Sequence, residues 1–161
     1  MTMSGLDKWY GYMKSHDTAA LWDLLHPDAV FESPVVHTPQ LGRDITFKYL
    51  ASAEKVLGGP GFKYTGEWRS ANGAVLEFEN EIEGIKINGV DIITFSDDGK
   101  ITHFKVMVRP LKGINLLHRL MGSNSRGSEP WFARSSPSPF MPHRLTRYLP
   151  ACSLPRTPGT G

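Results

Sequence analysis

The first sixty residues place apolar side chains three or four positions apart, which is typical of amphipathic helices. This spacing predicts a helix over residues 6–16, a second helix that Asp17 can cap and that His26-Pro27 ends, and a third helix over residues 44–57. A short strand is expected over residues 29–35, at an edge or rim because Pro34 interrupts it.

From residue 62 onward the apolar and polar positions alternate, which predicts strands. The expected strands cover residues 62–69, 76–82, 85–95 and 101–109, and a short helix over 111–121 follows them. Helices grouped before a strand meander indicate the α+β class. We expect a cone-shaped α+β barrel, in which a curved antiparallel sheet wraps around three N-terminal helices and the open end of the cone forms a pocket.

The register of the meander decides what faces this pocket. Glu83-Gly84 and Asn88-Gly89 compete as hairpin turns; a turn at Gly84-Ile85 leaves two long strands and makes Asn88-Gly89 a bulge. That register places Asp91 opposite Phe78 on one side and opposite Val106 on the other. Among apolar neighbours the pKa of a carboxyl rises, and a neutral carboxylic acid can donate a hydrogen bond to a substrate oxygen. The alternative is that Asp91 bonds only to backbone groups, or points outward after a one-residue slip.

Other candidate residues surround the same predicted pocket. His37, in a loop between prolines, is either a base near neutral pH or simply exposed. Glu32 and Ser33 are adjacent on the rim strand, so only one of them points inward. Asn80 is either a satisfied core amide or a ligand contact. The expected walls of the pocket are aromatic: Trp9, Tyr10, Phe78 and Phe104. His103 and Lys105 fall on the opposite face of the sheet, which either is solvated or faces a subunit.

Composition narrows the function classes. The 161 residues contain 18 Lys and Arg, 16 Asp and Glu, and one cysteine, Cys152, which excludes an internal disulfide and a multi-cysteine metal site. No apolar run reaches the length of a membrane span and no signal core begins the sequence, so a cytoplasmic protein without membrane association is expected. No phosphate loop, dinucleotide fingerprint or metal-ligand motif occurs, so no cofactor and no metal are expected.

The chain divides near Gly122 into two compositions. Residues 123–161 are rich in proline, serine and arginine, and we expect this tail to be disordered and without assigned function. Its arginines are spread out and residues 1–122 show no basic stripe with interleaved aromatics, so nucleic-acid binding is not expected. Residues 1–122 form the predicted domain.

Two stretches of this domain resemble the nuclear transport factor 2-like superfamily, which includes SnoaL-like polyketide cyclases and ketosteroid isomerases. They are Leu-His-Pro-Asp-Ala-Val-Phe-Glu-Ser-Pro-Val at 25–35, followed by Gly-Arg-Asp-Ile from Gly42, and the hairpin Val-Asp-Ile-Ile-Thr-Phe-Ser-Asp-Asp-Gly-Lys-Ile at 90–101. The resemblance spans about residues 6–110. It implies the cone-shaped fold and a homodimer that packs through the outer sheet face.

The resemblance also carries over site positions. The ketosteroid isomerase family has a catalytic Asp where this chain has Ser33, an oxyanion-hole Tyr where it has Trp9 beside Tyr10, and a second oxyanion donor at the position of Asp91. The implied function is a pocket for a small hydrophobic carbonyl, polyketide-like or steroid-like molecule, with proton-transfer chemistry of the isomerase, cyclase or dehydratase type. Asp91 would be the hydrogen-bond donor and His37 or Glu32 a displaced base. The alternative is a non-catalytic module of the same fold that binds a ligand or a protein.

Overall fold

The computed structural model describes residues 4–123 of the chain. Apart from Ser123, the predicted tail lies outside these described residues. The helices are α1 (Gly5–Ser15), α2 (Thr18–Leu24), α3 (Arg43–Leu57) and α4 (Leu111–Ser123). The strands are β1 (Leu25–Glu32), β2 (Gln40–Leu41), β3 (Lys63–Arg69), β4 (Gly73–Ile82), β5 (Ile85–Phe95) and β6 (Ile101–Arg109).

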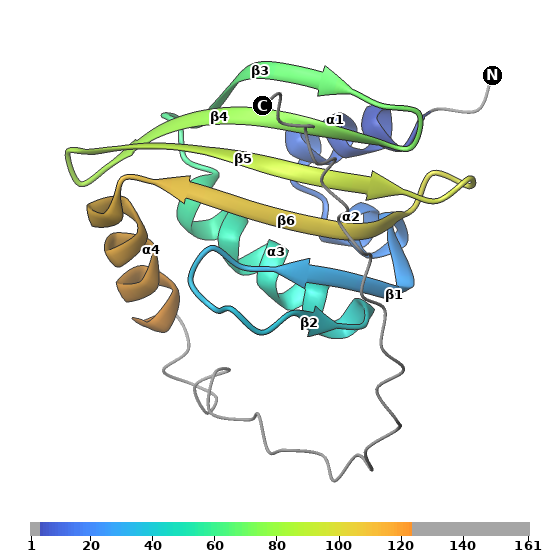
Figure 1. Ribbon diagram of the computed structural model, residues 1–161, viewed down its shortest axis with the longest axis horizontal. Helices are drawn as coiled ribbons and strands as arrows, with labels where there is room; N and C mark the ends of the chain where they lie inside the picture. Colours follow the sequence, from blue (N-terminus) through green and yellow to red (C-terminus); the bar gives the residue numbers. More distant parts are fainter. Residues whose placement is uncertain (1–3, 124–161) are drawn as a thin grey trace, which may run out of the picture.

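The six strands form one curved, open sheet in the order β2-β1-β6-β5-β4-β3. The meander β3–β6 is antiparallel, as predicted, but β1 pairs with β6 in parallel, so the sheet is mixed. Helices α1 to α3 cover one face, and α4 lies at one end beside β6 (Figure 1). This arrangement confirms the predicted α+β fold, with a sheet that curves around helices without closing into a barrel.

Polar side chains begin the first two helices, and the predicted cap at Asp17 is one of them. Ser4 caps α1 in a reciprocal capping box with Asp7, and Asp17 accepts a hydrogen bond of 2.9 Å from the backbone N–H of Ala19 at the start of α2. The expected end of α2 is wrong by two residues. The helix ends at Leu24, and His26 and Pro27 already belong to β1, whose last residue precedes Ser33.

The hairpin between β4 and β5 turns at Glu83-Gly84, one residue earlier than predicted. Both turn residues have positive φ, 50° and 73°, as a two-residue turn of the favoured twist requires. Asp91 therefore pairs with Leu76 rather than Phe78, although its predicted pairing with Val106 is confirmed. The error amounts to two positions along β4, so every side chain keeps its predicted face.

Asn88-Gly89 is neither a turn nor a bulge, because the ladder between β4 and β5 runs without a shift from end to end. Gly89 pairs with Phe78, whose ring crosses over it. A Cβ atom at position 89 would lie 2.4 Å from Phe78 Cζ and 2.5 Å from the carbonyl oxygen of Met107. The glycine thus gives an aromatic side chain room against the backbone of the neighbouring strand.

Strand β3 changes face along its length. Its pairing with β4 shifts between Tyr64 and Gly66, so one extra residue interrupts the alternation. Tyr64 points toward the helices, whereas Trp68, predicted on the same side, pairs with Val75 and is 58% exposed on the outer face. The β3 bulge therefore lets one strand contribute an aromatic side chain to each face of the sheet.

Within residues 4–123, no helix is long and apolar enough to cross a membrane.

Candidate functional site

A cavity of about 70 Å³ lies between the concave face of the sheet and helices α1, α3 and α4. Its walls are mostly apolar and aromatic. The sheet supplies Phe31, Phe78, Phe104, Val106 and Val108, the residue before β3 supplies Phe62, and the helices supply Trp9, Met13, Leu50, Leu57, Leu117 and Met121. Five side chains with hydrogen-bonding oxygens also line it: Tyr12, Ser33, Glu54, Tyr64 and Asp91. An apolar cavity with a few polar groups is typical of a small-molecule site.

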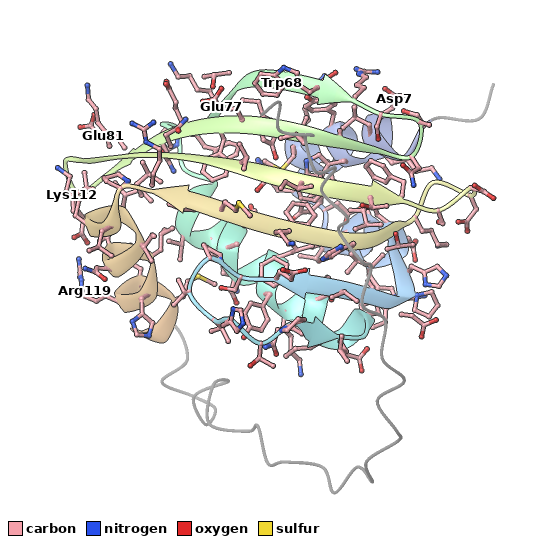
Figure 2. All side chains as sticks on the ribbon, viewed as in Figure 1. Asp7, Trp68, Glu77, Glu81, Lys112 and Arg119 are labelled. Carbon is pink, nitrogen blue, oxygen red and sulfur yellow. The ribbon has the colours of Figure 1, made fainter. Side chains whose placement is uncertain are left out.

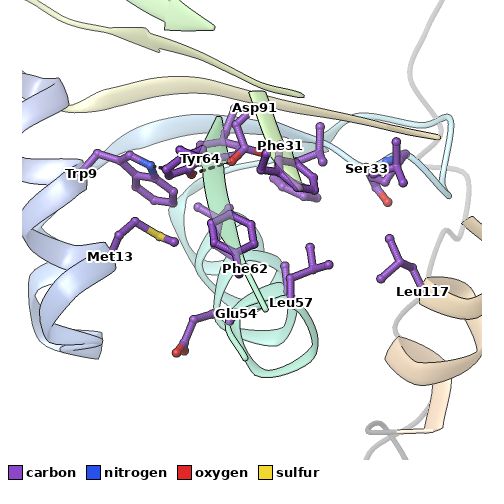
Figure 3. A pocket seen from close by; sticks show the side chains of 18 of the residues that line it. Trp9, Met13, Phe31, Ser33, Glu54, Leu57, Phe62, Tyr64, Asp91 and Leu117 are labelled. Atoms are coloured by element: carbon purple, nitrogen blue, oxygen red, sulfur yellow. Dashed lines mark hydrogen bonds between the residues drawn. The ribbon is translucent and has the colours of Figure 1, made fainter. Parts of the chain in front are cut away.

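A chain of three hydrogen-bonded side chains forms one end of the cavity (Figure 3). The indole Nε1–H of Trp9 donates to the hydroxyl oxygen of Tyr64 at 3.1 Å, and the Tyr64 hydroxyl donates to Asp91 Oδ2 at 2.8 Å. Helix α1 presents Trp9 on its buried face, β3 presents Tyr64 just before the β3 bulge, and β5 presents Asp91 at an inward position. We call this set the Trp9–Tyr64–Asp91 chain.

Asp91 is the one buried carboxylate of the described residues, with 7% of its surface exposed. Leu76 and Val106 lie beside it on the neighbouring strands. Burial raises the pKa of the Asp91 carboxyl to about 7, and the hydrogen bond from Tyr64 opposes part of that rise. A pKa raised this far keeps the neutral carboxylic acid populated near neutral pH, and its proton can be donated to a ligand oxygen.

Tyr64 remains a neutral phenol under the same conditions. Burial above all, and then the charge of Asp91 and the hydrogen bond to it, raise the pKa of Tyr64 well above its ordinary value of about 10. Its hydroxyl proton is used toward Asp91 and its oxygen accepts from Trp9. Within the Trp9–Tyr64–Asp91 chain, the neutral Asp91 carboxyl is therefore the group whose O–H proton can be donated to a ligand.

The structure brings five of the nine predicted site residues together along the cavity: Trp9, Ser33, Phe78, Phe104 and Asp91. Ser33 follows the end of β1, and its hydroxyl oxygen accepts hydrogen bonds from the backbone N–H groups of Val35 at 3.1 Å and Val36 at 3.4 Å. Of the adjacent pair Glu32 and Ser33, only Ser33 points inward, as alternation along a strand requires.

The other four predicted residues lie elsewhere. Glu32 is on the outer face, where its carboxylate contacts His103 Nε2 at 2.7 Å and Lys105 Nζ at 3.1 Å. The Tyr10 hydroxyl donates to Glu67, and His37 is exposed in its loop. Asn80 is a satisfied core amide, because its Nδ2 donates to the Leu57 carbonyl and its Oδ1 accepts from the Glu81 N–H, both at 2.8 Å. None of these four lines the cavity.

Sequence reasoning missed three polar residues that do line the cavity: Tyr12, Glu54 and Tyr64. The sequence pattern indicates the position of Tyr64, which follows Phe62 by two residues and so lies on the predicted inner side of its strand. The pattern indicates Tyr12 and Glu54 less clearly. The buried face of α1 continues from Leu6 and Trp9 to Tyr12 rather than to Tyr10, and Glu54 lies between Leu50 and Leu57 on α3 at helical spacing.

Many solved structures have the same fold, and three of them span a range of sequence identities. A steroid delta-isomerase from Pseudomonas aeruginosa is 37% identical, with a TM-score of 0.71 over 76% of this chain and 90% of that chain. An uncharacterized protein with a cystatin-like fold from Silicibacter pomeroyi is 23% identical, with a TM-score of 0.71 over 80% of this chain and 90% of that one. A hypothetical protein with a ketosteroid isomerase-like fold from Catenulispora acidiphila, in complex with trimethylamine, is 14% identical, with a TM-score of 0.52 over 71% and 91%. The last two likenesses concern the fold alone.

No curated protein matches the chain. The model of the SnoaL-like domain matches residues 6–104, which is more than half of the chain and contains Trp9, the β3 bulge and Asp91. Most residues that line the cavity lie in the matched range, with the Trp9–Tyr64–Asp91 chain among them, and four wall residues follow it: Val106, Val108, Leu117 and Met121. The chain belongs to the SnoaL-like domain family of the nuclear transport factor 2-like superfamily.

Proposed function

We propose that this protein binds a small apolar carbonyl compound in the cavity and moves a proton on it, in a reaction of the isomerase, cyclase or dehydratase type. The observation that carries the proposal is the buried Asp91 carboxyl, held by Tyr64 at the end of a mostly apolar cavity. The neutral acid donates a hydrogen bond to the carbonyl oxygen, where negative charge develops when a neighbouring C–H bond loses its proton. The name of the 37% identical protein from Pseudomonas aeruginosa supports this class of chemistry.

The cavity also limits the size of the ligand. Pockets that hold drug-sized molecules measure roughly 300–1,000 Å³, and this one measures about 70 Å³. A single-ring ketone therefore fits this cavity better than a four-ring steroid does. Small cyclic ketones are the first substrates to test.

The direct experiment follows the isomerisation of cyclohexenone with its double bond in the β,γ-position, with a β,γ-unsaturated ketosteroid in parallel. A base removes the proton between the carbonyl and the double bond, the C–H electron pair forms a dienol, and a proton returns to the γ-carbon. The conjugated product absorbs ultraviolet light, so the full-length protein should give an absorbance increase faster than buffer. A protein that neither turns over nor binds either ketone would contradict the proposed function.

A second candidate is a non-catalytic binding module of the same fold. Ser33 favours it, because it stands where the resembling isomerases carry a carboxylate and a hydroxyl is too weak a base at neutral pH. Under this alternative, the conjugated cyclohexenone binds in a titration while no proton exchange into deuterated water is detected by NMR.

The outer face of the sheet is proposed as the contact surface of a homodimer. Trp68 and Met107 are 58% and 52% exposed there, and Val75, Val90 and Ile92 extend the apolar area across β4 and β5 (Figure 2 looks onto this face).

Met107→Glu places a charge in the middle of this area, so it should shift the sedimenting species from twice the chain mass to the chain mass. Glu81→Gln, at an exposed position of β4, is the control that should stay dimeric; a wild-type monomer at micromolar concentration would contradict the proposal.

A further inference from the structure

The direction of donation along the Trp9–Tyr64–Asp91 chain is set by its first member. An indole N–H donates a hydrogen bond and cannot accept one. Trp9 Nε1 lies 3.1 Å from the Tyr64 hydroxyl oxygen, so that oxygen is the acceptor of this bond. The Tyr64 hydroxyl proton must therefore point away from Trp9, because it would otherwise face the indole hydrogen.

The hydroxyl proton of Tyr64 has an acceptor on its other side. Asp91 Oδ2 lies 2.8 Å away, and among the described residues it is the acceptor that the Tyr64 hydroxyl contacts. A hydroxyl hydrogen rotates to the acceptor that is present. Figure 3 shows the two bonds in succession, from the indole on helix α1 through the phenol on β3 to the carboxyl on β5.

The bond from Tyr64 decides which oxygen of the neutral Asp91 carboxyl carries the acid proton. A carbonyl oxygen accepts a hydrogen bond better than the hydroxyl oxygen of an acid does, so Oδ2 is the carbonyl oxygen and Oδ1 bears the proton. Oδ1 has no hydrogen-bond partner among the described residues, and Asp91 lines the cavity. The acid proton is therefore left for a ligand oxygen.

Without the indole N–H, the same groups can be ordered in the opposite direction. A phenol oxygen accepts a hydrogen bond from a neutral carboxylic acid as readily as a phenol donates one. The hydroxyl proton of Tyr64 would then turn toward the place where the indole N–H of Trp9 lies now. In that arrangement Tyr64 takes up the Asp91 proton, and none is left for a ligand.

The surroundings of Asp91 contain no other group that fixes its proton. The neighbouring strands place the apolar Leu76 and Val106 beside it. Besides Tyr64, the titratable side chains that line the cavity are Tyr12 and Glu54, and neither is hydrogen-bonded to Asp91 in the described structure. Burial and the bond from Tyr64 are therefore the two influences on the pKa of Asp91, the first raising it and the second lowering it.

We propose that Trp9 and Tyr64 are positioning residues that keep the Asp91 proton directed into the cavity, with the donor-only indole setting the direction of the hydrogen-bond chain. The inference rests on the proposed function, in which this proton is donated to a carbonyl oxygen. When the substrate C–H bond loses its proton, its electron pair shifts negative charge to that oxygen, and the Oδ1–H donor stabilises the charge. The site therefore favours a ligand group that accepts a hydrogen bond, such as a ketone oxygen, over a group that only donates.

Trp9→Phe tests this direction in the full-length chain, with β,γ-cyclohexenone as the substrate. The variant removes the N–H and keeps an aromatic ring beside Phe104. We expect kcat/KM to fall about tenfold, which corresponds to one hydrogen bond of ordinary strength. In a Tyr64→Phe background the same substitution should cost less than about threefold, because no phenol is there to take the Asp91 proton. Equal losses in both backgrounds show that Trp9 only packs, and they would overturn the proposal.

The titration of Asp91 gives a second readout, which does not depend on turnover. It is followed by carbon NMR of protein labelled at the aspartate carboxyls, with the Asp91 signal assigned by its loss in Asp91→Asn. Trp9→Phe and Tyr64→Phe should each raise the pKa of Asp91 above its wild-type value of about 7, because the ionised carboxylate has a weaker donor or none. Trp9→Phe thus increases the population of the neutral acid while it lowers the rate, which a simple loss of the neutral acid cannot produce.

Tyr10→Phe is the matched control for these variants. It removes a neighbouring hydroxyl of α1 that donates to Glu67 and does not line the cavity, so the rate and the Asp91 titration should both stay as in the wild type. Tyr64→Phe lacks a single oxygen atom, and its titration alone carries the test if Trp9→Phe does not fold.

The proposal and the proposed function fail in different ways. An Asp91 titration that is unchanged in Trp9→Phe and Tyr64→Phe overturns the direction of the hydrogen-bond chain, even where the wild-type protein isomerises ketones. A raised pKa in both variants, in a protein whose wild type neither binds nor converts a ketone, overturns the function and leaves the direction of the chain standing.

Discussion

Asp91→Asn should lower the rate of proton transfer on a bound ketone by roughly 10²–10³-fold, which is the usual effect of removing one donor to a developing oxyanion. Asparagine keeps the shape of the side chain and can still accept the hydrogen bond from Tyr64. It loses the acidic proton, which strengthens its hydrogen bond to oxygen as negative charge accumulates there. The measurement is kcat/KM for the isomerisation of β,γ-cyclohexenone, with the inhibition constant of the conjugated product as the measure of ground-state binding.

The control for this variant is Asp97→Asn, an exposed carboxylate of the turn between β5 and β6 that is remote from the cavity lining. It should have the wild-type rate. A binding module would respond differently, because Asp91→Asn would then change ligand affinity slightly and no rate would exist to lose. Unchanged turnover in a folded Asp91→Asn protein would contradict the donor role.

Wild-type protein should become less stable relative to Asp91→Asn as the pH rises from about 4 to about 7. The Asp91 carboxyl has a pKa of about 7 in the folded protein and an ordinary value of 3.8 in the unfolded chain. Below pH 4 both states hold the proton, and between these values only the folded state does, so ionisation favours unfolding. A difference of about three pKa units corresponds to at most about 4 kcal/mol, fully developed above the folded pKa.

Urea unfolding of both proteins at several pH values from 4 to 8 measures this difference. Other carboxyls have pKa values lowered by their partners, and they make both proteins less stable toward acid: Asp7, Glu32, Glu67 and Asp98. Because these groups are present in both chains, their contributions cancel in the difference, as does any constant cost of burying the asparagine amide. We expect the difference to change by about 2–4 kcal/mol; two parallel stability curves would show that the pKa of Asp91 is the same in the folded and the unfolded protein.

Most elements of the fold could be predicted because they depend on local signals. Helix α3 and strands β5 and β6 match their expected ranges within one residue, since each combines a clear period with a glycine or a turn at its ends. The parallel pairing of β1 with β6 has no local signal, because these strands are far apart in the sequence. The prediction of a bulge at Asn88-Gly89 is wrong because the sequence does not distinguish two reasons for a glycine. Gly89 makes room for the Phe78 ring that crosses it, whereas the prediction treats it as a turn or bulge residue.

The candidate site could be predicted in part for the same reason. Asp91 was found because alternation fixes which face of a strand a side chain occupies, and this survives a register error of two residues. His37 and Glu32 are predicted from their chemistry and their proximity in sequence to Ser33. In the structure, however, the loop leaves His37 exposed, and alternation along β1 places Glu32 on the outer face of the sheet. Glu54 was not considered, because a glutamate on a partly exposed helix looks like an ordinary surface residue until α1 is placed against it.

The β3 bulge also bears on how far the length of this strand can vary. With one extra residue, Tyr64 reaches Asp91 while Trp68, four positions later, lies on the opposite face. Removing Thr65 would leave the two aromatic residues three positions apart. Strict alternation would then keep them on opposite faces, with Tyr64 still opposite Phe78 and Trp68 still opposite Val75. We therefore expect β3 to tolerate the deletion of this one residue without losing the phenol from the cavity or the indole from the outer face, and related proteins can keep both aromatic residues on a strand that is one residue shorter.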